Sequence, residues 1–223
     1  GDNMLDMKLN DLRKLITEEA DYVTSMISMA YEGLFERNEE LFTEIYKLED
    51  KLNDLEMQVE DDAIGLMALH QPEAKNLRTI IMIIKMNNDL ERLGDHVVNI
   101  TKCATRILGS SVIIKYIDLP LMFKETMKMM RDAIAAFINQ DTELASMVMG
   151  ADDLIDNFRD QIFRVNMSHM ISSPETTPAR MQINEIASHL ERIADLTTNI
   201  CEEVVFMVKG RVVKHNATQE QAE

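Results

Sequence analysis

Residues 89–100 read DLERLGDHVVNI, and residues 189–200 read HLERIADLTTNI. The two stretches share Leu, Glu, Arg, Asp, Asn and Ile at the same places, one hundred residues apart. Apolar side chains recur in both at every third or fourth position, which is the period of an amphipathic α-helix. A helix repeated over this distance predicts that the chain contains two copies of a larger helical unit.

The rest of the chain has the same helical period. Residues 41–66 and 144–169 keep apolar side chains at nearly every third or fourth position, so each stretch is expected to form one long helix. Turn signals divide the chain near residue 38, at HQPE (70–73), at GSSVIIKYID (109–118), at Asp141 and at SSPETTPAR (172–180). The pattern predicts an all-α fold of six long helices in two pseudo-symmetric three-helix bundles, residues 1–109 and 110–223.

Composition restricts the function. The chain has 39 acidic and 23 basic residues, a formal net charge of −16, which opposes binding to nucleic acid because phosphates attract Lys and Arg. No apolar run is long enough for a membrane span, and the N-terminal residues do not resemble a signal peptide. We therefore expect a soluble cytoplasmic protein in which Cys103 and Cys201 are reduced thiols.

The repeated motif places two carboxylates on one face of each helix. Glu91 and Asp95 are four residues apart, and so are Glu191 and Asp195, so each pair lies on adjacent turns. Two like charges at this spacing repel each other unless a cation lies between them. The motif therefore predicts two metal sites, with a solvated polar helix face as the alternative.

Two further carboxylate pairs extend this prediction. They lie in the second and fifth predicted helices, again with four-residue spacing: Asp50 with Asp54, and Asp152 with Asp156. If each pair faces the motif across a helix interface, one bundle brings four carboxylates together. Glu49 or Asp153 could replace a member of these pairs, and a solvated helix face remains open here as well.

These stretches of the chain resemble the PhoU family. The resemblance is carried by DLERLGDHVVNITK (89–102), by HLERIADLTTNICEEVVFMVKG (189–210) and by the LEDKLNDLE (48–56) and LMALHQP (66–72) stretches. It implies a cytoplasmic, often dimeric protein without established catalytic activity, located at the inner face of the membrane when bound to its partners. It further implies a regulator that represses the phosphate-starvation response through the Pst phosphate ABC transporter and the PhoR sensor histidine kinase.

The resemblance also implies metal cofactors. Some members bind multinuclear iron or other metal clusters at Glu/Asp-x-x-x-Asp pairs, which correspond here to Glu91 with Asp95, Glu191 with Asp195, Asp50 with Asp54, and Asp152 with Asp156. Carboxylate oxygens also accept Zn, Mn and Mg. The sequence therefore leaves the metal open.

Three alternatives remain. PhoU-like domains also occur in sodium–phosphate cotransporters and in accessory proteins of other phosphate carriers. A carboxylate-bridged metal enzyme would need an open coordination position and a general base, for which the sequence supplies no clear histidine. In a purely structural scaffold, the motif acids would be solvated or would pair with Arg92 and Arg192.

Overall fold

The computed structural model describes residues 2–112, 114 and 117–210, and this part of the chain contains α-helices and no β-strand. The first half forms three long helices: α1 (Asp2–Phe35), α2 (Glu40–His70) and α3 (Ala74–Ile107). The second half forms α4 (Leu119–Asn139), α5 (Thr142–Met149), α6 (Asp152–Ser172) and α7 (Thr177–Lys209), with a short 3₁₀ turn before α7. The predicted fold class is confirmed.

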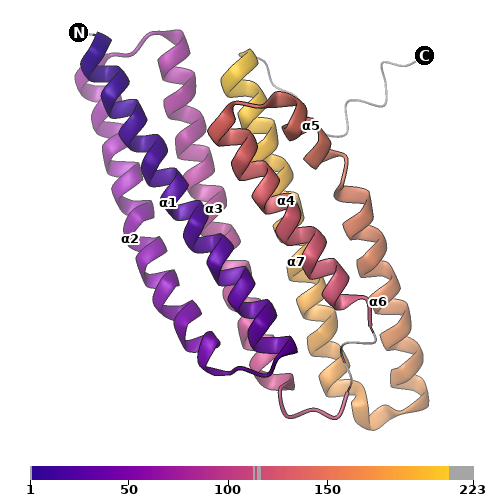
Figure 1. Cartoon of the computed structure of the whole chain (residues 1–223). Helices are drawn as coiled ribbons and strands as arrows, with labels where there is room; N and C mark the ends of the chain where they lie inside the picture. Colours follow the sequence, from indigo (N-terminus) through magenta and orange to yellow (C-terminus); the bar gives the residue numbers. More distant parts are fainter. Residues whose placement is uncertain (1, 113, 115–116, 211–223) are drawn as a thin grey trace, which may run out of the picture.

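The helices are arranged as two bundles side by side (Figure 1). Helices α1, α2 and α3 pack together as the first bundle, and α4 to α7 form the second. Helices α3 and α7, which carry the repeated motif, share the most extensive contact of any helix pair. Across this contact the Nδ1 atoms of His96 and His189 lie 3.0 Å apart.

The buried positions of the two bundles correspond at fixed spacings. A shift of 103 residues relates α1 to α4, because it pairs the buried residues Ile16 with Leu119 and Ile27 with Met130. The same shift relates α2 to α6, pairing the buried Leu52 with Ile155 and Val59 with Ile162, whereas α3 and α7 differ by 100 residues. These spacings give residues 16–35 of α1, and the residues of α2 and α3, counterparts in the second bundle.

The fifth predicted helix is not continuous. It is divided into α5 and α6 at Gly150 and Ala151, and the amide of Gly150 donates to the Ser146 carbonyl at 3.2 Å. Glycine lowers helix stability because it has more backbone freedom to lose, and Asp152 and Asp153 then begin α6 where negative charge is favourable. The apolar period continues through the break, which explains why periodicity alone predicts one helix.

The other helix ends follow the sequence signals. The side chain of Asp141 accepts a hydrogen bond from the Leu144 amide at 3.0 Å and so caps α5. Gly210 follows α7 with a left-handed φ of 68°, a conformation that glycine adopts without steric cost. Cys103 and Cys201 are both buried and unbridged. None of the described helices is both long enough and apolar enough to cross a lipid bilayer.

Candidate functional site

The second bundle brings four carboxylates together between α6 and α7. We call these residues the second carboxylate cluster: Asp152, Asp156, Glu191 and Asp195. Asp156 lies close enough to Glu191, and Asp195 close enough to Asp152, for the neighbouring acid to raise its pKa. The four-residue spacing on each helix places both acids of that helix on the face turned toward the other.

Partial burial and mutual repulsion make this cluster retain protons. Desolvation raises the pKa of Asp156 to about 6, and the hydrogen bond and charge of Glu191 add to the effect. Desolvation also raises the pKa of Asp195 to about 6, with the charges of Asp152 and Glu191 contributing. Near neutral pH the second carboxylate cluster therefore carries more negative charge than its surroundings stabilise.

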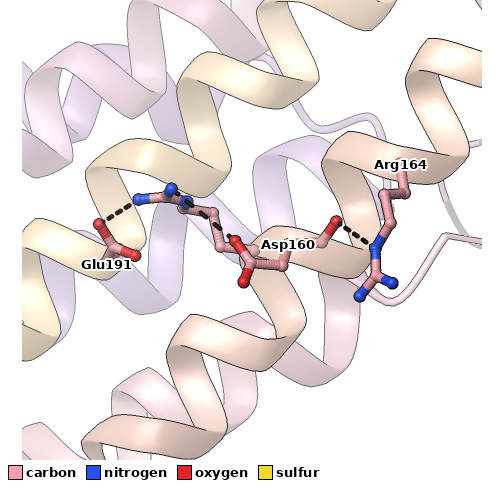
Figure 2. Close-up of polar contacts among 4 residues, drawn as sticks. Asp160, Arg164 and Glu191 are labelled. Carbon is pink, nitrogen blue, oxygen red and sulfur yellow. Dashed lines mark hydrogen bonds and ion pairs between the residues drawn. The ribbon is translucent and has the colours of Figure 1, made fainter.

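One arginine of α6 partly compensates this charge. The Nη1 atom of Arg159 donates to Oε1 of Glu191 at 2.6 Å, and the two side chains are 35% and 18% exposed. Figure 2 shows Glu191 and Asp160 on two sides of this guanidinium, with Arg164 further along α6. In the described structure Glu191 thus pairs with Arg159 rather than with Arg192, a partner that the sequence analysis did not identify.

The first bundle has a related group between α2 and α3. We call it the first carboxylate cluster: Glu49, Glu56, Glu91 and Asp95. Partial burial raises the pKa of Glu91 to about 7, and the hydrogen bond and charge of Asp95 and the charge of Glu56 add to it. The pKa values of Glu49 and Glu56 are also raised, first by burial and then by acidic neighbours that include Asp95.

The structure favours Glu49 and Glu56 over the predicted residues Asp50 and Asp54. Both of these aspartates have exposed side chains, and only Asp50 is close enough to influence the pKa of Glu49. The spacing of 103 residues explains the difference, because Asp152 corresponds to Glu49 and not to Asp50. Asp50 and Asp54 are four residues apart, as Asp152 and Asp156 are, but each lies one residue beyond the position that corresponds to its partner in α6.

The donor type of both clusters suits metal ions, but the arrangement is not a preformed site. Carboxylate oxygens are ligands for Fe, Mn, Mg and Zn, and repulsion among the acids would be relieved by a bound cation. Within the described residues, however, no group of three or more His, Cys, Asp or Glu side chains is placed to hold a metal ion. Metal binding here would require the carboxylates to converge further.

The raised pKa values predict that stability falls between about pH 4 and pH 7. In the folded protein the pKa values of Glu91, Asp156 and Asp195 are about 7, 6 and 6. In the unfolded chain these groups have their ordinary pKa values of 4.5, 3.8 and 3.8, so they hold their protons more tightly when folded. This stabilisation is complete below the unfolded pKa and is lost as the pH rises through the folded pKa. Urea denaturation should therefore give a larger free energy of unfolding at pH 5 than at pH 7.5.

Replacing these three carboxylates by amides tests whether they cause the fall in the free energy of unfolding with pH. In the triple variant Glu91→Gln, Asp156→Asn and Asp195→Asn, the decline from pH 5 to pH 7.5 should be shallower than in the wild type. The exposed Asp54→Asn serves as the matched control and should leave the slope unchanged. A triple variant with the wild-type slope would show that these carboxylates do not have the assigned pKa values.

A family model and the named relatives of this chain agree with each other. The family model of the PhoU domain matches residues 16–104 and 119–204. A phosphate-specific transport system accessory protein PhoU homolog of Aquifex aeolicus is 33% identical over 216 residues, covering 97% of this chain and 98% of the relative. A homolog from Thermotoga maritima is 30% identical over 208 residues, covering 93% and 90%.

Two solved structures share the fold. The crystal structure of PhoU from Pseudomonas aeruginosa matches with a TM-score of 0.88 at 27% identity, covering 92% of this chain and 99% of that one. The crystal structure of the phosphate transport system regulatory protein PhoU from Streptococcus pneumoniae matches with a TM-score of 0.87 at 27% identity, covering 94% and 99%.

Proposed function

The chain belongs to the PhoU family, and on this basis we propose that it is a non-enzymatic regulator of phosphate uptake and phosphate-starvation signalling. The observation that carries the proposal is the family match to both halves of the chain, which include both copies of the repeated motif. The relatives that match nearly the whole chain are named as accessory proteins of the phosphate-specific transport system. Their names favour this role over that of a cotransporter domain or a metal enzyme.

The proposed partners are membrane proteins. The chain would act at the inner face of the membrane, on the phosphate ABC transporter and on a sensor histidine kinase. We propose that the contact is made in the cytoplasm, through protein surfaces. We further propose that the regulator acts as a homodimer.

The proposed cofactor is a transition metal held by the carboxylate clusters. Glu91 and Asp95 with Glu49 and Glu56 would hold it in the first bundle, and Asp152, Asp156, Glu191 and Asp195 in the second. Iron is the first candidate, with Zn, Mn and Mg as alternatives. When bound, the cation would neutralise the carboxylates and hold two helices together. In the second bundle, Arg159 competes with it for Glu191.

Complementation tests the regulatory role. In a bacterium that lacks its own PhoU protein, a phosphate-starvation reporter is expected to be active in phosphate-rich medium. This chain should restore repression to near the wild-type level, whereas the double variant Glu191→Gln and Asp195→Asn should restore less, because these substitutions remove two carboxylates of the second cluster. The metal content of both purified proteins should be measured in parallel by elemental analysis.

The two parts of the proposal fail separately. A reporter that stays fully active with the wild-type chain, although the chain is present in the cell, would contradict the regulatory role. Equal metal content in the wild type and the double variant, or its absence from both, would contradict metal binding by the second carboxylate cluster. The exposed double variant Asp50→Asn and Asp54→Asn is the matched control, and it should behave as the wild type does.

A further inference from the structure

A completely buried carboxyl group lies in the core of the first bundle. Glu19 of α1 is 0% exposed, and neither of its carboxyl oxygens has a hydrogen-bond partner within the described structure. Burial, with a smaller contribution from the charge of Glu56, raises the pKa of Glu19 to about 9. Buried polar groups almost always have a partner, and an exception points to an unseen ligand or a functional role.

A second buried oxygen atom without a donor belongs to a residue of α3 that is hydrogen-bonded to α2 at Glu56. Asn87 of α3 is 4% exposed, and its Nδ2 donates to the backbone oxygen of Glu56 in α2 at 3.0 Å. The Oδ1 atom of Asn87 has no hydrogen-bond partner in the described part of the chain. The Glu56 side chain is half-buried, and its charge adds to the raised pKa of Glu19. Residues of three helices thus place oxygen atoms here, and within the described residues only burial and acidic neighbours act on the pKa values of Glu19 and Glu56.

The second bundle provides an internal comparison. At the spacings that relate the bundles, Glu19 corresponds to Met122, Glu56 to Arg159 and Asn87 to Ala187. Met122 and Ala187 are both 0% exposed, so the same core positions are filled there by apolar side chains. All three oxygen-bearing residues are therefore absent from the counterpart site. The fold does not require them, because the second bundle packs without them.

We propose that Glu19, Glu56 and Asn87 form an inner site for a hard divalent cation between α1, α2 and α3. Two carboxylates and an amide oxygen are the ligand types that Mg²⁺, Mn²⁺ and Ca²⁺ accept, with water completing the coordination shell. The site lies deeper than the repeated motif and does not use Glu91 or Asp95. It shares Glu56 with the first carboxylate cluster, but Glu19 and Asn87 belong to the inner site alone, and the inner site is independent of the proposed regulatory role.

Mn²⁺ titration of the full chain, after removal of metals with a chelator, tests this site. The motif acids are first neutralised in the variant Glu91→Gln, Asp95→Asn, Glu191→Gln and Asp195→Asn. Isothermal titration of this variant should still show one Mn²⁺ per chain. Adding Glu19→Gln should weaken that binding by about tenfold or more, since the loss of even an outer-shell partner commonly has this effect.

Two substitutions copied from the second bundle serve as matched variants. Glu19→Met and Asn87→Ala each place the counterpart residue at the site, and each should weaken Mn²⁺ binding in the same background. Lack of Mn²⁺ binding by the folded background variant, or unchanged affinity after both Glu19 substitutions, would overturn the inner site. Neither result would bear on repression of the phosphate-starvation reporter, so the two proposals are tested separately.

Discussion

Substitution of Glu19 by methionine is expected to raise the free energy of unfolding of the metal-free protein by about 2 kcal/mol, because a buried polar group without a partner costs about 1–3 kcal/mol. The second bundle already has Met122, completely buried, at the corresponding core position. For a chain of this size, the increase corresponds to a rise of about 4–8 °C in Tm. Thermal unfolding with a chelator present, followed by circular dichroism, measures it.

The pH dependence of the stabilisation by Glu19→Met shows whether the buried carboxyl group causes it. Burial raises the pKa of Glu19 in the folded protein to about 9, above its ordinary value of 4.5, so the wild type loses stability as the pH rises from about 5 to about 9. Methionine has no such loss, and the advantage of the variant should therefore grow over this range. The isosteric Glu19→Gln also has no ionisable group and should share this pH dependence, but it retains a buried polar group and should be less stable than Glu19→Met at every pH. A lower Tm for Glu19→Met in the presence of chelator would contradict the assigned cost of the buried carboxyl group.

Substitution of Gly94 by valine is expected to lower the free energy of unfolding by about 3 kcal/mol, at the upper end of overpacking costs. A Cβ atom at this position would lie 2.5 Å from Cδ2 of Leu52, far closer than real contacts allow. Leu52 is 1% exposed and lies in the interface between α2 and α3, so it has little room to move. Urea denaturation monitored by circular dichroism measures the loss.

A second glycine in a helix interior provides the control. Gly65 of α2 has no atom within 4 Å of the place where its Cβ would lie. Gly65→Ala should therefore stabilise the protein by about 0.5–1 kcal/mol, the usual difference in helix propensity. The two substitutions are thus expected to have opposite signs. Destabilisation by both, or by neither, would show that the close approach of α3 to α2 at Gly94 does not determine the result.

The candidate site was only partly predictable from the sequence. The motif acids Glu191 and Asp195 meet Asp152 and Asp156 across one helix interface, as their spacing predicted. Spacing alone could not choose between Asp50 and Glu49, because both lie beside the interface and only the register of α2 against α3 separates them. The alignment of Glu49 with Asp152 was a signal in the sequence that pointed to Glu49 as the residue nearer the motif acids. The pairing of Arg159 with Glu191 had no comparable signal, since side-chain pairing depends on the distance between two helices.

The sequence by itself determined the all-α fold, the two-fold repetition and the family, because helical periodicity and the repeated motif are local patterns along the chain. The tertiary structure decided the break at Gly150, the members of the first carboxylate cluster and the isolation of Glu19. Glu19 lies in the apolar row between Ile16 and Val23, and so its position already indicated burial. Whether a buried carboxyl group finds a donor depends on which side chains of the neighbouring helices face it, and packing among three helices decides this.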